Sequence, residues 1–87
     1  MSKVYLVSRD GYLESIMGSR AAVDAEGVAQ IIASHRMEYF MEHIRNVQVD
    51  FETGIVQFEC KPEWEEDWEQ EEAMIIPFEI VKNNLPS

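Results

Sequence analysis

The longest regular pattern of hydrophobic positions in this chain lies between residues 24 and 45. Its apolar side chains recur at steps of three and four residues, the spacing that gathers them on one face of an α-helix. These positions are Val28, Ala29, Ile32, Ala33, Met37, Phe40, Met41 and Ile44. Asp24 is suited to cap the amino end, because its carboxylate can accept hydrogen bonds from backbone amides that the helix leaves free. We therefore expect one long helix over residues 24–45.

A β-hairpin is expected over residues 3–17. β-Branched and aromatic side chains are dense in residues 3–9, and Asp10-Gly11 suits the tight turn that joins two antiparallel strands. The return strand would complete an apolar set that faces the helix and the core, made up of Val4, Leu6, Leu13 and Met17. The outer face would then carry a second apolar set, which another segment or a partner would have to cover. This second set is Tyr5, Val7, Tyr12 and Ile16.

A second hairpin is expected over residues 47–60, with its turn at residues 51–54. Gly54 fits the left-handed position in such a turn. Pairing Val49 with Val56 places five apolar side chains of the hairpin on one face. This face consists of Val47, Val49, Val56, Phe58 and Cys60. A shift of one residue would divide the set between two faces, so the alternation itself selects the register.

Residues 74–81 are expected to add a further strand, because they are rich in β-branched and aromatic side chains. Pro77 lacks the N–H that a central strand needs, which favours an edge strand. Residues 82–87 are polar and contain a proline, as is typical of a flexible C-terminal tail. The predicted order gives a single α+β domain over residues 1–81. It would contain a mainly antiparallel sheet of about five strands (two hairpins plus a C-terminal edge strand), with one long α-helix packed across one face.

Residues 61–73, KPEWEEDWEQEEA, concentrate the negative charge, since seven of these thirteen residues carry a carboxylate. Two conformations fit the pattern. One is a helix that begins near Pro62 and places Trp64 and Trp68 on one face. The other is an extended, twisted hairpin arm with residues 65–67 at its tip. We slightly favour the helix, although like charges crowded on a short helix repel one another.

Tryptophan among carboxylates is an unusual combination, because a large ring gains nothing from exposure to water. The two rings either anchor this segment on the sheet or serve as aromatic anchors in a contact surface ringed by charge. Both interpretations hold at once if one ring points inward and the other outward. The predicted partner-binding residues are Glu63, Trp64, Glu65, Glu66, Asp67, Trp68, Glu69, Glu71 and Glu72.

The whole chain carries 17 acidic and 7 basic side chains, and its formal net charge of −10 opposes binding to nucleic acid and to anionic membranes. This charge favours a basic protein surface as partner, although acidity also serves plain solubility. Cys60 is the only cysteine, so no disulfide can form within the chain, and a reducing, cytoplasmic setting fits best. The N-terminus lacks the apolar run of a signal peptide, and no segment is long enough to cross a bilayer.

The residues that usually carry chemistry show no recognised arrangement. His35 and His43 lie eight residues apart, whereas helical metal sites place histidines four apart or use a Glu-x-x-His motif. Cys60 ends an apolar strand face and is interpreted as a small core residue. We therefore expect no enzymatic activity, no cofactor and no metal site.

In size, acidity and lack of catalytic groups, the chain resembles the small acidic proteins that bacteriophages and mobile elements encode against host defence or transcription, including anti-CRISPR proteins and DNA mimics. Several of those proteins occupy nucleic-acid-binding surfaces. Together with the acidic segment, this resemblance favours a non-enzymatic inhibitor that docks on a basic protein surface. The alternative is a self-associating or adaptor protein, in which the apolar outer face of the first hairpin or the edge strand at residues 75–81 forms a homodimer.

Overall fold

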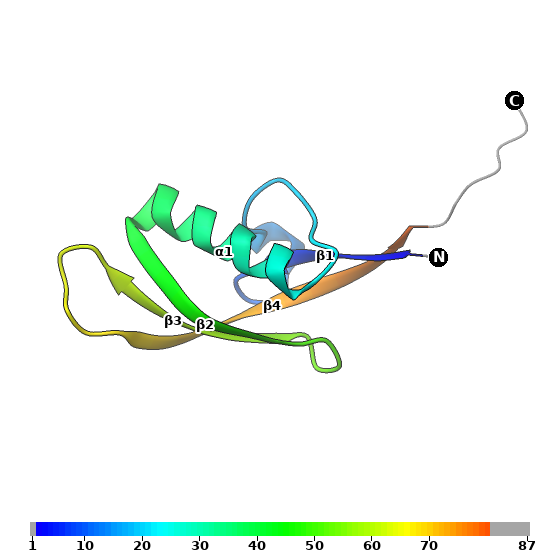
Figure 1. The fold of residues 1–87 in the computed structure, drawn as a ribbon. Coiled ribbons are helices and arrows are strands. Elements are labelled where there is room, and N and C mark those ends of the chain that lie inside the picture. Colours follow the sequence, from blue (N-terminus) through cyan, green and yellow to red (C-terminus); the bar gives the residue numbers. More distant parts are fainter. Residues whose placement is uncertain (1, 81–87) are drawn as a thin grey trace, which may run out of the picture.

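One helix crosses one face of a four-stranded antiparallel sheet (Figure 1), in a computed structural model that describes residues 2–80. The elements in chain order are β1 (Ser2–Ser8), the short 3₁₀ helix η1 (Leu13–Ser15), α1 (Ala25–Phe40), β2 (Glu42–Asp50), β3 (Ile55–Pro62) and β4 (Glu69–Ile80). The strands lie side by side in the order β1-β4-β3-β2. The α+β class is therefore confirmed, while the prediction of about five strands is wrong by one.

The predicted first hairpin forms only in a trace, because β1 pairs along its length with β4 and residues 9–24 contain no strand. What remains of it is an isolated bridge between Ser8 and Ile16. There the Met17 amide donates to the Val7 carbonyl at 2.8 Å and the Arg9 amide donates to the Ser15 carbonyl at 3.0 Å.

A type I′ turn needs a positive φ at both central residues, and of Asp10 and Gly11 only Gly11 has one, 91°. The Asp10 carboxylate instead accepts hydrogen bonds from the Tyr12 amide at 3.1 Å and from the Ser15 hydroxyl at 3.1 Å. These bonds stabilise a wider turn, which leads into η1 in place of a return strand.

The faces of β1 are opposite to the predicted ones. Val7 is fully buried and pairs with Ile75, which is 5% exposed, so the alternation along β1 directs Val7 to the helix and the core. Val4 and Leu6 consequently point to the other face of the sheet. In the connection after β1, Met17 is buried as predicted, but Leu13 is 58% exposed. The prediction failed because both faces of β1 are apolar and only the distant strand β4 decides between them.

Helix α1 begins where the sequence predicts, since the Asp24 carboxylate accepts a hydrogen bond from the Gly27 amide at 2.8 Å. It ends at Phe40 and does not continue to residue 45. Met41 adopts the left-handed conformation, with φ 53°, and its amide bonds the Met37 carbonyl. Residues 42–45 belong to β2, which pairs with β3.

The buried face of α1 is also narrower than predicted, because its last turn extends past the core. Val28, Ile31 and Ile32 are buried, whereas Met37 and Phe40 are 38% and 49% exposed.

The second hairpin, β2–β3, is the most accurate part of the prediction. Val49 pairs with Val56, and Gly54 in the turn has a φ of 79°. Val56, Phe58 and Cys60 are buried, and Val47 and Val49 pack against them. The one departure is a shift of register between Arg45 and Gln48, where Asn46 has a positive φ of 54°.

Strand β4 is longer than the predicted strand over residues 74–81 and lies inside the sheet, between β1 and β3. Its first half pairs with β3 and its second half with β1, so each half has a partner on one side. Pro77 lies opposite Tyr5, whose backbone N–H and C=O bond Ala22 instead. The missing N–H of Pro77 therefore faces the open side of β4, which is why the strand tolerates a proline. Val81 and the predicted tail at residues 82–87 lie outside the described residues.

Met17 and Leu13 provide a test of this packing, because the sequence pattern places both in the core and the structure separates them. Met17→Ala should lower the free energy of unfolding by about 2–5 kcal/mol, since Met17 is 2% exposed and truncation leaves a cavity. Leu13→Ala should change it by about 0.5 kcal/mol or less, because the side chain is already in water. Urea unfolding followed by circular dichroism measures both. Equal losses would contradict the described connection between β1 and α1.

Candidate functional site

The acidic segment is a hairpin arm, so the extended alternative is correct and the slightly favoured helix is wrong. Strand β3 ends at Pro62, β4 begins at Glu69, and residues 63–68 form the loop between them, drawn in yellow in Figure 1. The cross-strand pairs place Cys60 opposite Glu69 and Gln57 opposite Glu72. An extended chain sends successive carboxylates to opposite faces, which separates like charges that a short helix would crowd together. We call residues 61–72 the acidic arm.

Backbone and lysine hydrogen bonds hold the loop of the acidic arm in place. The Glu63 amide donates to the carbonyl of Met41, just after α1, at 3.1 Å. The Glu65 amide donates to the Pro62 carbonyl at 3.1 Å, and the Lys61 ammonium donates to the Glu65 carbonyl at 2.8 Å. The loop is therefore tied both to itself and to the end of the helix.

The two tryptophans of the arm have different environments. Trp68 is half-buried, with the guanidinium carbon of Arg45 4.0 Å from its ring centroid and the Lys61 ammonium 5.8 Å away. Cations at these distances are attracted to the face of the indole ring. Trp64 is 69% exposed. The rings therefore do not share one helical face: Trp68 packs against the sheet and Trp64 projects into solvent.

Most of the predicted carboxylates are exposed, as Trp64 is. The exposed ones are Glu63, Glu65, Glu66, Asp67, Glu69 and Glu72. Glu63 lies 3.6 Å from the His43 ring nitrogen, and Glu72 accepts a hydrogen bond from the Gln57 amide at 3.3 Å. Glu71 is the exception, because its carboxylate is 34% exposed and turns inward to an arginine. The structure thus exposes seven of the nine predicted residues on the arm, while Trp68 is half-buried against the sheet and Glu71 turns inward.

Arg36 is the arginine that receives Glu71, and the sequence analysis missed it. Its guanidinium lies 3.0 Å from a Glu42 oxygen and 2.5 Å from a Glu71 oxygen. The same group lies over the rings of Phe40, at 5.5 Å, and Phe58, at 5.4 Å. Arg36 is only 9% exposed, so the C-terminal part of α1 is joined to the start of β2 and to β4 through one buried cation. The sequence does carry a signal for this buried arginine. Arg36 lies four residues after Ile32 and four residues before Phe40, a spacing that places all three on the same side of a helix.

Cys60 lies beside this ion-paired cluster and is 1% exposed. Burial, together with the nearby carboxylates of Glu71 and Glu42, raises the pKa of the Cys60 thiol to about 12. The thiol is therefore neutral at physiological pH, in keeping with its predicted place in the core, and it lacks the thiolate form that nucleophilic chemistry needs.

The two histidines lie in separate places. His35 is half-buried against Tyr39, with ring centroids 4.7 Å apart, and burial followed by the charge of Arg36 lowers its pKa. His43 is on β2 and faces Glu63. Across residues 2–80, no three His, Cys, Asp or Glu side chains are arranged to hold a metal ion.

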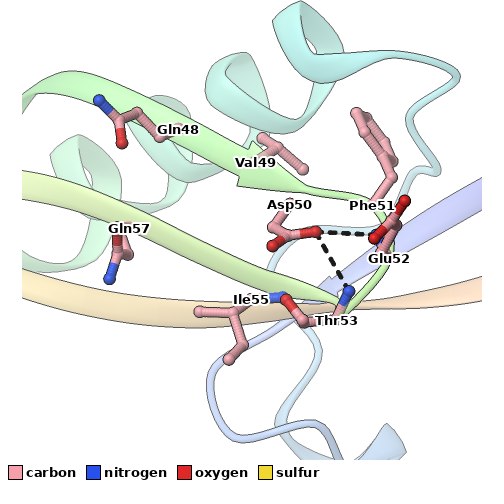
Figure 2. A pocket seen from close by; sticks show the side chains of 8 residues that line it. All are labelled: Gln48, Val49, Asp50, Phe51, Glu52, Thr53, Ile55 and Gln57. Atoms are coloured by element: carbon pink, nitrogen blue, oxygen red, sulfur yellow. Dashed lines mark hydrogen bonds between the residues drawn. The ribbon is translucent and has the colours of Figure 1, made fainter.

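A shallow hollow at the β2–β3 turn is lined by polar and apolar residues of both strands (Figure 2). The Asp50 carboxylate accepts hydrogen bonds from the amides of Glu52, at 2.9 Å, and Thr53, at 3.2 Å. These bonds lower the pKa of Asp50, the bond from Thr53 having the largest effect. Because Oδ1 of Asp50 already accepts both hydrogen bonds of the turn, the hollow is a product of hairpin geometry and is a weaker candidate than the acidic arm.

Comparisons of this chain with models of known families, with curated proteins and with solved structures find no match. Within residues 2–80, no helix has the length and apolar character needed to cross a membrane. The case for function therefore rests on the geometry of the acidic arm.

The Arg36 cluster predicts a large effect of a single substitution. Arg36→Ala should lower the free energy of unfolding by about 3 kcal/mol, because it leaves Glu42 and Glu71 without their cation. This is the low end for a buried ion pair, since Glu71 is 34% exposed. Arg20→Ala is the matched control and should change stability by about 0.5 kcal/mol or less, because Arg20 is exposed. Chemical denaturation measures both, and equal small effects would show that the cluster contributes little.

Proposed function

We propose that this chain is a non-enzymatic, cytoplasmic binding protein that docks its acidic arm on a basic surface of another protein. The observation that carries the proposal is the exposed ring of Trp64, placed among carboxylates on a loop that hydrogen bonds hold in position. A tryptophan that is 69% exposed contributes little to the core, so its ring is available as an anchor for a partner.

The surroundings of Trp64 match the usual anatomy of a protein interface. Binding energy tends to concentrate in a few aromatic or arginine side chains, surrounded by polar groups that contribute less. Here the loop that carries the exposed indole ring also carries exposed carboxylates, among them Glu65, Glu66 and Asp67. These charges would steer a basic partner toward the arm and disfavour acidic ones.

The end of α1 extends this surface with apolar side chains. Phe40 and Met41 are 49% and 52% exposed, and the hydrogen bond from Glu63 to Met41 places them next to the loop that carries Trp64. The partner surface that fits is thus basic but also offers apolar contacts beside its lysines or arginines. A nucleic-acid-binding protein with such a surface would be blocked by this chain, as expected for a phage-type inhibitor that imitates phosphate charge.

Charge reversal tests the proposal. Replacing Glu65, Glu66, Asp67 and Glu69 with lysine should abolish capture of the partner on immobilised protein, because attraction at the contact surface becomes repulsion. A matched control replaces four exposed acids outside the arm with lysine, namely Glu14, Glu26, Glu38 and Glu52. This control variant should still capture the partner at the same salt concentration. Captured proteins are identified by mass spectrometry and then measured as purified pairs. If both quadruple variants behave alike, net charge and not the arm governs binding.

Trp64→Ala adds the aromatic part of the test with a purified pair. The loss of a hot-spot ring should raise Kd by about 30-fold or more, while the melting temperature stays unchanged because the ring is exposed. Trp68→Ala is the comparison and should lower the melting temperature, since that ring packs against Arg45 and Lys61. Unchanged affinity in Trp64→Ala would remove the ring from the proposed contact.

A further inference from the structure

The sheet face opposite α1 divides into a polar half and an apolar half. Residues that pair directly in an antiparallel sheet point to the same face, and those that alternate with the core residues point away from α1. Over β2, β3 and the first half of β4, the side chains on this outer face are mostly polar, and the apolar exception is Ile55, which pairs with Met74. The polar side chains include Gln48, Asp50, Gln57, Glu59, Gln70 and Glu72.

Where β1 pairs with β4, the same face becomes apolar. Val4 pairs with Phe78 and Leu6 pairs with Ile76. Met74 lies two residues before Ile76 in β4 and points to the same face. We call these five side chains the outer patch. Phe78 is 41% exposed and the other four are half-buried. Among residues 2–80, no helix or strand lies over them, because α1 crosses the opposite face (Figure 1). The turn after β1 covers part of Met74, whose sulfur lies next to Gly11.

The open edge of β4 beside the outer patch is a poor site for adding a strand. Ile75 already donates its amide to the Gly54 carbonyl at 2.8 Å. Two residues further along, Pro77 has no N–H to offer on the same side. An added strand would therefore find few donors, so the face of the sheet and not its edge is the surface left for contact.

We propose that the outer patch is covered by the outer patch of a second copy of this chain, in a two-fold symmetric dimer with the sheets packed face to face. A symmetric contact brings a surface against itself, so the surface must complement itself. The acidic arm cannot do this, because it would bring like charges together. The outer patch can, because none of its side chains is charged, in a chain whose formal net charge is −10.

Most carboxylates of the acidic arm lie far from the centre of the outer patch. Ile76 lies seven residues from Glu69 along β4, a distance of roughly 24 Å at the rise of a strand. Charges this far apart in water are largely screened, since the Debye length is about 8–10 Å under physiological conditions. Glu72 is the nearest carboxylate of the arm, two residues from Met74 and roughly 7 Å away along β4. The dimer stands independently of the proposed function and leaves both acidic arms free for partners.

Five side chains per copy make a small contact, less than the roughly 800 Å² that each partner commonly contributes to a stable complex. The dimer should therefore be in exchange with monomer, and sedimentation equilibrium on the full chain at about 1 mM protein is the test. The wild-type protein should show an average mass above that of the monomer at this concentration, and the mass should rise with concentration. A chain that stays monomeric contradicts the proposal and leaves the patch to a different occupant.

Variants locate the contact. Phe78→Lys should give a monomer at the same concentration, because it places a charge in each half of an apolar interface. Val4→Thr keeps the shape of a β-branched side chain and should weaken the dimer at least several-fold without disturbing the strand. Leu13→Lys is the control, because Leu13 is 58% exposed but lies outside the patch, and it should remain dimeric. Circular dichroism confirms folding of each variant, and a dimer that persists in folded Phe78→Lys or Val4→Thr overturns the proposal.

Discussion

The buried guanidinium of Arg36 is the interaction on which the arrangement of the helix, the sheet and the acidic arm depends. Its ion pairs with Glu42 and Glu71 join the C-terminal part of α1 to the first residue of β2 and to β4. They also remove one carboxylate of the acidic segment from the surface and direct it inward. A cation buried between two aromatic rings is costly unless its charge is matched, so both glutamates are needed there. This cluster sets the direction of the acidic arm, because Arg36 contacts both strands that lead into the arm. It contacts Phe58 of β3 and Glu71 of β4.

An arm held in this way lowers the cost of binding. Ordering a loop and its side chains at an interface opposes association, and a loop that is already ordered avoids part of that cost. The hydrogen bonds from Glu63 to Met41 and from Lys61 to Glu65 order the loop in the free protein, while Trp68 is held under Arg45. Trp64 is then the one ring of the arm that is presented to solvent. The acidic arm and the outer patch lie at different ends of β4, so the two proposed contacts do not compete.

The parts of the fold that could be predicted are those where local pattern and tertiary partner agree. The β2–β3 hairpin has one apolar and one polar face and a short turn, so alternation around Val49 and Val56 selects the register. Strand β1 has apolar residues on both faces, and its true partner β4 is about 70 residues away, so no local signal places Val7 inside. The helix end was missed because Met41 and Ile44 continue the helical spacing into β2, where a left-handed Met41 breaks the helix. The acidic segment was recognised as the candidate site, but its conformation depends on pairing with β3, which its composition does not reveal.

If the acidic arm is held in one conformation before a partner binds, the backbone motion of its loop should be as restricted as that of the strands. Nuclear magnetic resonance relaxation of the backbone amides in the free protein measures this directly. Order parameters for residues 63–68, including Trp64, should be near 0.85, about the value of rigid backbone. Values below about 0.6, the range of flexible chain, would contradict a preformed contact surface and make the acidic arm a solvated loop.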